Sequence, residues 1–258
     1  MELGYALILG IIQGITEWLP VSSSAHLALA HKMLGIGASP AFDVALHAGT
    51  LLAVLLAFRK EYTLMLKALL RLDCKSPAGK TLTLIILATI PGAVAGYLFK
   101  DVFESLFSNT AAIGIALIIT AALLYAASKT KGVKDVTTKE AAIIGLAQAI
   151  SIAPGISRSG STIAAAMLSG VERNKAAMFS LLLSVPIILG AAVYELRKAS
   201  LLELEPMPTL IGITASFIVG YASIRVLLKF VKESKLQYFA YYCAILGIIC
   251  ITFLANLR

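Results

Sequence analysis

Long apolar runs separated by short charged segments dominate the sequence. A helix needs about 17 to 25 apolar residues to cross roughly 30 Å of hydrocarbon, and six of the runs are long enough. We predict six transmembrane helices, at residues 40–58, 81–99, 105–128, 176–194, 206–224 and 236–257. The predicted fold class is therefore an all-α integral membrane protein.

Two further apolar runs are interrupted near their middle. The interrupting residues are charged or break helices: Glu17 and Pro20 in the run 3–31, and Pro154, Gly155 and Arg158 in the run 141–171. Each half-run of about 14 residues would form about 20 Å of helix, which is too short to cross. We therefore predict two re-entrant helix-loop-helix hairpins, whose breaks face the protein interior and each other.

The two hairpins are related in sequence. An offset of 135 residues aligns similar residues, namely Gly10 with Gly145, Gln13 with Gln148, Val21 with Ile156, Ser22 with Ser157, Ser24 with Ser159 and Gly35 with Gly170. Three spans follow each hairpin, and an odd number of crossings inverts the second copy. We predict one membrane domain, residues 1–258, with an inverted-topology repeat formed by about 1–130 and 136–258.

Charge orients this arrangement. Charged residues make up 14% of the chain, against roughly 25% in soluble domains. The net charge of +8 comes from lysines and arginines between the apolar runs, without the interleaved aromatic residues that would suggest nucleic-acid binding. Basic loops face the cytoplasm, which places segments 59–80, 129–139 and 225–235 inside. Both termini and the entrance of the first hairpin are then outside.

Both breaks place hydroxyl groups at the start of a second half-helix. These residues are Ser22, Ser23 and Ser24 in the first break, and Ser157, Ser159, Ser161 and Thr162 in the second. A helix start offers unpaired N–H groups and the positive end of the helix dipole, which together favour anions. Two facing starts predict a cradle for a polyanion.

Four further side chains add chemistry to this cradle. Arg158 has a planar fork suited to phosphate oxygens, and Glu17 can hold a divalent ion or move a proton. Gln13 lies one helical turn before Glu17 and can add a carbonyl ligand. His26 can exchange protons near neutral pH. The set predicts phosphoryl transfer.

Structural explanations compete with this interpretation. Each serine could simply cap a half-helix. Glu17 and Arg158 could form a buried structural ion pair, although ionisable residues at membrane depth are functional candidates by default. His31 and His47 lie outside both breaks and are expected to be packing or boundary residues. Asp43 is expected to cap a helix.

At these two motifs, the sequence resembles the undecaprenyl-pyrophosphate phosphatase family of the bacitracin-resistance type. One signature is Glu/Gln-x-x-x-Glu, here Gln13 to Glu17, followed by Leu-Pro-Val-Ser-Ser; the other is Pro-Gly-x-Ser-Arg-Ser-x-x-Thr, here Pro154 to Thr162. The resemblance covers essentially the whole chain. It implies a plasma-membrane hydrolase that removes the terminal phosphate of a C55 polyprenyl diphosphate, recycles this cell-wall lipid carrier, needs a divalent metal and opens to the outer face.

The resemblance also implies roles for individual residues. The functional set of the family corresponds to Gln13, Glu17, Ser23, His26 and Arg158. Many members have Glu at the position of Gln13, and a neutral amide binds Mg²⁺ or Ca²⁺ more weakly than a carboxylate does.

A mechanism follows as a hypothesis. The diphosphate is expected to bind the backbone amides and a group of side chains around the two helix starts, namely Ser22, Ser24, Gly155, Ser157, Arg158, Ser159 and Thr162. A Mg²⁺ or Ca²⁺ ion held by Glu17 and Gln13 would neutralise charge on the transferring phosphoryl group. Ser23 would attack the phosphorus while His26 or Glu17 takes its proton, or water would attack directly with help from His26.

A second class of function fits the same architecture. Inverted repeats with broken helices also occur in transporters, so a transporter or flippase for an anionic lipid is the alternative. The expected partners are the polyprenyl diphosphate and the bilayer, with no nucleic acid. The sequence leaves the oligomeric state open, a homodimer included.

Overall fold

The computed structural model describes residues 2–37, 39–196 and 204–254. In these ranges it is all-helical, apart from an isolated bridge between Lys134 and Val171. The helices are α1 (Leu3–Trp18), α2 (Ser23–Leu34), α3 (Pro40–Ala57), α4 (Arg59–Leu70), α5 (Pro77–Leu98), α6 (Lys100–Phe107), α7 (Thr110–Ser128), α8 (Thr138–Ile150), α9 (Arg158–Leu168), α10 (Arg173–Leu196), α11 (Pro206–Lys232) and α12 (Leu236–Thr252).

Five of these helices are long and apolar enough to cross a membrane: α3, α5, α7, α10 and α11. Their outward faces carry the apolar side chains that contact with lipid requires; on α5, for example, Ile86, Ile90 and Val94 are about half exposed. The chain is therefore a multi-pass, all-α membrane protein. The predicted sixth span, 236–257, corresponds to the apolar helix α12, and residues 255–257 lie outside the described residues.

The structure corrects two predicted span boundaries and one predicted loop. The span predicted at 105–128 starts too early, because Asn109 separates α6 from α7 and its Oδ1 accepts the Ala112 N–H at 3.0 Å. The segment predicted as a basic loop after the first span contains the helix α4. The helix α11 extends to Lys232, beyond the predicted end at 224, because the Lys and Arg residues of its last turns continue the helix.

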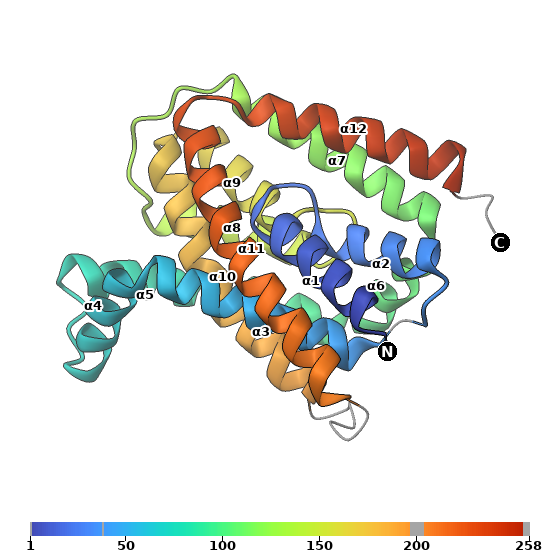
Figure 1. Cartoon of the computed structure of the whole chain (residues 1–258). Helices are drawn as coiled ribbons and strands as arrows, with labels where there is room; N and C mark the ends of the chain where they lie inside the picture. The colour runs from blue at the N-terminus through green and yellow to red at the C-terminus, as the bar shows by residue number, and fades with distance from the viewer. Residues whose placement is uncertain (1, 38, 197–203, 255–258) are drawn as a thin grey trace.

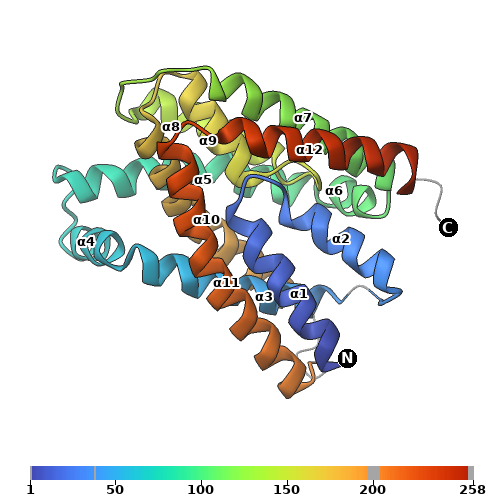
Figure 2. The ribbon, with the colours of Figure 1, turned by 45° about the horizontal axis from the view of Figure 1, so that its top comes forward.

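Small residues let the helices approach closely. The helix α1 packs on α11, α8 packs on α5, and α7 packs on α12, as the two views in Figures 1 and 2 show. A Cβ at Gly10 would lie 2.6 Å from the Gly212 carbonyl oxygen, and a Cβ at Gly145 would lie 2.8 Å from the Ala88 carbonyl oxygen. Glycine is therefore needed at both contacts, as in other tightly packed membrane helices.

The basic segments gather at one end of the molecule. The helix α4, the 129–137 connection and the α11–α12 turn lie on the left of both Figures 1 and 2, whereas α6 and the start of α1 lie on the right. One end of the helix bundle is thus rich in Lys and Arg, as the charge pattern predicts.

Candidate active site

The helices break where the sequence predicts. The first break lies between α1 and α2 and contains Pro20, which has no backbone N–H to continue a helix. The second lies between α8 and α9 and contains Pro154. Both breaks end at a serine that caps the next helix. Ser22 Oγ accepts the Ala25 N–H at 3.4 Å, and Ser157 Oγ accepts the Gly160 N–H at 3.1 Å.

The two breaks are bonded to each other. The Gly155 N–H donates to Ser22 Oγ at 3.2 Å, and Ser159 Oγ donates to the Leu19 carbonyl oxygen at 3.3 Å. Gly155 has a φ of +97°, and a Cβ there would lie 2.5 Å from the Ile113 carbonyl oxygen. Only glycine fits this conformation and this space. These contacts bring the starts of α2 and α9 together.

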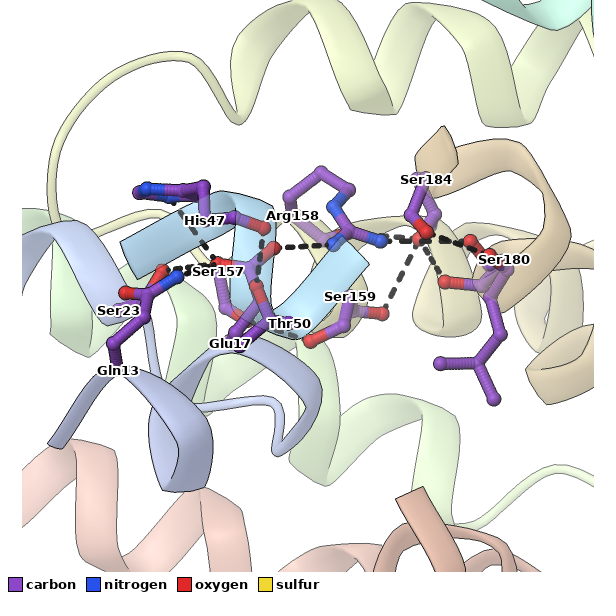
Figure 3. A network of polar contacts seen from close by, with 12 residues as sticks. Gln13, Glu17, Ser23, His47, Thr50, Ser157, Arg158, Ser159, Ser180 and Ser184 are labelled. Carbon is purple, nitrogen blue, oxygen red and sulfur yellow. Dashed lines mark hydrogen bonds and ion pairs between the residues drawn. The ribbon is translucent and has the colours of Figure 1, made fainter. Parts of the chain in front are cut away.

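A buried carboxylate links the two breaks (Figure 3). Glu17 is 7% exposed, and its Oε1 lies 2.7 Å from Arg158 Nη2. Ser23 Oγ donates to Glu17 Oε2 at 2.7 Å, and Gln13 Nε2 donates to the same oxygen at 3.2 Å. His47 Nε2 lies 3.5 Å from that oxygen. Burial removes water from this ion pair, so the cation and the hydroxyl stabilise the carboxylate directly.

A cavity of about 300 Å³ lies against this cluster. Its polar lining comes from both breaks and from α3: Thr16, Glu17, Ser22, Ser23, Ser24, His47, Gln148, Ser151, Ser157 and Arg158. Apolar residues of α3, α6 and α10 complete the wall, among them Val44, Phe107 and Ala191. We call this space the polar cavity. It combines one carboxylate, one guanidinium and several hydroxyls, which suits a phosphate group.

His47 was assigned wrongly from the sequence. It was expected to pack or to lie at a boundary, yet it lines the polar cavity beside Glu17. Its Nδ1 lies 2.7 Å from the carbonyl oxygen of Asp43, which fixes the ring. An ionisable residue inside an apolar span was a sequence signal for a functional role. The sequence could not show, however, that His47 contacts Glu17 of α1, because that contact depends on how the helices pack.

Asp43 was also assigned wrongly. Ser39 caps α3, because its Oγ accepts the Phe42 N–H at 3.4 Å. The Asp43 carboxylate instead contacts His31, with 3.1 Å between Oδ1 and Nε2. This pair lies outside the lining of the polar cavity.

The Arg158 side chain is held on several sides. Its guanidinium lies 5.5 Å from the centre of the Trp18 ring, and its Nη1 is 3.5 Å from the Ser180 carbonyl oxygen. The Ser180 hydroxyl in turn lies 2.6 Å from Thr162 Oγ1. Since α1, α9 and α10 all contribute, the guanidinium is fixed before any substrate arrives.

Five predicted site residues do not line the polar cavity. One is Gln13, which lies behind Glu17 and donates from Nε2 to Glu17 Oε2 at 3.2 Å. His26 Nδ1 lies 2.8 Å from the Ser22 carbonyl oxygen, and its Nε2 lies 2.7 Å from the Tyr242 hydroxyl. The other three are Gly155, Ser159 and Thr162, whose polar atoms bind protein groups within or beside the second break. The geometry therefore shows no direct contact of His26, Gly155, Ser159 or Thr162 with a ligand in the polar cavity.

Comparison with known proteins places this site in a family. The family model described as "Bacitracin resistance protein BacA" matches residues 6–249. The chain belongs to this family. Relatives named undecaprenyl-diphosphatase are 41% identical in Korarchaeum cryptofilum (98% of this chain, 100% of the relative), 40% in Methanosphaera stadtmanae (95% and 96%) and 41% in Carboxydothermus hydrogenoformans (94% of each).

The oxygen atoms near Glu17 determine whether this member of the bacitracin-resistance family could hold a metal ion. The described residues contain no group of three or more His, Cys, Asp or Glu side chains arranged for a metal. However, Gln13 Oε1 is buried and has no hydrogen-bond partner beside the Glu17 carboxylate. Mg²⁺ commonly takes one or two carboxylates and completes its shell with water and substrate phosphate oxygens, so these two residues fit it.

Proposed function

We propose that this chain is an undecaprenyl-diphosphatase. It removes the terminal phosphate of undecaprenyl diphosphate, and the resulting monophosphate returns to use as a lipid carrier in cell-wall synthesis. Membership of the bacitracin-resistance family and full-length relatives with this name support the proposal. The observation that carries it is the contact of Glu17 with both Ser23 and Arg158, one partner from each break, beside a cavity inside a membrane protein.

Ser23 is the nucleophile in this proposal. Its hydroxyl already donates to Glu17 at 2.7 Å, so Glu17 is the base placed to take the proton. The bond from Ser23 Oγ to the terminal phosphorus forms as the bridging phosphorus–oxygen bond breaks, and the prenyl monophosphate leaves. Water then hydrolyses the phosphoserine and releases phosphate. His26 is less well placed, since both ring nitrogens have other partners.

Arg158 and the helix starts hold the diphosphate. Arg158 offers N–H groups beyond the one that binds Glu17, and they match phosphate oxygens. Hydroxyls of Ser22, Ser24 and Ser157 line the same space. Charge develops on the phosphoryl oxygens, so donors that are fixed in advance lower the barrier. Gly155, Ser159 and Thr162 keep the second break in shape.

A divalent cation completes the proposed site. Glu17 and Gln13 would hold Mg²⁺ or Ca²⁺, which supplies charge neutralisation at the phosphoryl group when bound. Removal of metal by a chelator is therefore expected to abolish phosphate release, and added Mg²⁺ or Ca²⁺ is expected to restore it.

The finer architecture also belongs to the proposal. We take the two broken helix pairs as re-entrant hairpins of an inverted repeat, because the α1–α11 packing has its counterpart in the α8–α5 packing. We take the polar cavity to open to the outer face of the plasma membrane, because its apolar wall includes Phe107 and Ala191, far from the basic segments. A homodimer remains a prediction from the sequence.

A transporter or flippase of a phosphorylated lipid is the second candidate, and the pairing of two broken helices favours it. Phosphate release by detergent-solubilised protein separates the two functions, because a detergent micelle has no second compartment. The proposal expects release of one phosphate for each undecaprenyl diphosphate. Binding without release would support the transporter. A phosphoserine trapped on Ser23 would distinguish covalent catalysis from direct attack by water.

A further inference from the structure

A second, largely apolar cavity adjoins the polar cavity. It has a volume of about 510 Å³ and lies among α5, α6, α10 and the second break. Both cavities share part of their lining, namely Phe107, Ile152, Ile187 and Ala191. We call it the apolar groove. The two cavities therefore lie side by side, so a molecule with its phosphates at Arg158 would have its next atoms beside this groove.

Each wall of the apolar groove has a distinct chemistry. The α5 wall consists mostly of small residues on one helical face, namely Thr89, Gly92, Ala93 and Gly96, and Tyr97 completes it. The α10 wall combines Pro186 and Ile187 with the small residues Gly190 and Ala191. A Cβ at Gly190 would meet no atom within 4 Å, so open space adjoins α10 at this point.

The helix α6 covers the groove. Lys100, Phe103, Glu104 and Phe107 follow the i, i+3, i+4, i+7 spacing of one helical face, and all four line the groove. Lys100 Nζ and Glu104 Oε1 are paired at 2.8 Å, so the charges of this face are neutralised. The two phenylalanines offer flat apolar surface to a hydrocarbon, while the ion pair marks the rim.

We propose that the apolar groove binds the isoprene units next to the diphosphate of the substrate. This inference rests on the proposed function and adds to it the part of the lipid that the protein recognises. The groove adjoins the phosphate site, shares four lining residues with it, is lined mostly by apolar and small residues, and has a limited volume. It therefore covers only the head-proximal units of an undecaprenyl chain, and the rest of the chain lies in the bilayer.

A substitution at Gly190 tests the groove. A Cβ at Gly190 meets no atom within 4 Å, so Gly190→Leu adds a side chain to open space and should not disturb the fold. We expect kcat/KM for farnesyl and undecaprenyl diphosphate to fall about tenfold, equivalent to about 1.4 kcal/mol. For isopentenyl diphosphate, whose single isoprene unit fills only the start of the groove, we expect less than about a twofold change. Val193→Leu on the same helix, half exposed and outside both cavities, is the matched control.

The outcomes separate the groove from the proposed function. Equal losses on short and long substrates, or no loss on any, would overturn the groove. Photo-crosslinking of wild-type protein with a diazirine-labelled farnesyl diphosphate gives a second result that needs no turnover. Labels on residues 89–107 and 186–191 support the groove even if phosphate release fails and the proposed function falls. Labels confined to the α1–α11 surface would overturn the groove while leaving an active phosphatase intact.

Discussion

The two helix breaks share a framework and differ in chemistry. In both, a serine caps the second half-helix, and the cap residues Ser22 and Ser157 are 135 positions apart. Both second half-helices also end near a glycine with positive φ, Gly35 in one and Gly170 in the other. The two breaks therefore share their cap positions, but the caps differ in backbone conformation, with a φ of +70° at Ser22 and −70° at Ser157.

Each residue of the proposed reaction occurs in only one of the two breaks. At the same offset, Glu17 corresponds to Ile152, and Ser23 corresponds to Arg158. The first break thus carries the acid and the hydroxyl, and the second carries the cation. The proposed site therefore takes its residues from both breaks and requires the two breaks to be in contact.

The largest expected effect comes from Ser23, the proposed nucleophile of the first break. Ser23→Ala should lower kcat for phosphate release by at least about 10³-fold, because no other hydroxyl contacts Glu17 in the described structure. Ser161→Ala is the control, because the Ser161 hydroxyl donates to the Ser157 carbonyl oxygen within the second break's helix. This change should lower kcat by less than about tenfold. Similar losses in both variants would remove the distinction between the breaks.

The cation of the second break should have the next largest effect. Arg158→Ala is expected to lower kcat/KM by about 10² to 10³-fold, and Arg158→Lys should recover only part of the loss, because lysine keeps the charge without the planar fork. Arg225→Ala, on the exposed surface of α11, should change kcat/KM by no more than about twofold. Wild-type turnover by Arg158→Ala would show that the diphosphate binds elsewhere.

Alanine substitutions at Gly155 and at Gly35 should destabilise the protein to different extents. Gly155→Ala combines a φ of +97° with a Cβ 2.5 Å from a carbonyl oxygen, so we expect a loss of more than about 2 kcal/mol in the free energy of unfolding. Gly35→Ala has a φ of +64° and no atom within 4 Å of the new Cβ, so about 1 kcal/mol is expected. Denaturation in detergent would measure both, and a larger loss at Gly35 would contradict the assigned strain.

The smallest effect concerns the histidine of the first break. Tyr242→Phe removes the hydroxyl that lies 2.7 Å from His26 Nε2, and about 1 kcal/mol, or roughly fivefold in kcat, is expected if His26 assists the reaction. Tyr241→Phe is the control, because Tyr241 is about half exposed on the same helix. An unchanged kcat in Tyr242→Phe would show that the hydrogen bond between Tyr242 and His26 does not contribute to catalysis.

The sequence predicted those features that depend on local chemistry. Pro20 and Pro154 cannot continue a helix, and serines at cap positions start the next one, so both breaks were predictable. The ionisable residues beside the breaks, Glu17 and Arg158, were predictable because charge at membrane depth needs a partner. Their 2.7 Å contact then follows from the meeting of the two breaks.

The sequence did not predict features that depend on packing. His47 contacts Glu17 because α3 crosses the end of α1, and no spacing within α3 encodes that contact. The short helices α4 and α6 were missed because their charged residues looked like loop residues, although both helices are amphipathic. Packing likewise decides two other contacts: His26 meets Tyr242 of α12, and Thr162 meets Ser180 of α10.

A double-mutant cycle on Glu17 and Arg158 tests the central claim, that both breaks act on one phosphoryl group. The conservative changes Glu17→Asp and Arg158→Lys keep both charges, so residual kcat/KM for undecaprenyl diphosphate can be measured in all four proteins. Residues in direct contact should show a coupling energy of about 1 kcal/mol or more. Effects that add within about 0.5 kcal/mol would show that the two residues act independently, and that a single site shared by both breaks does not exist.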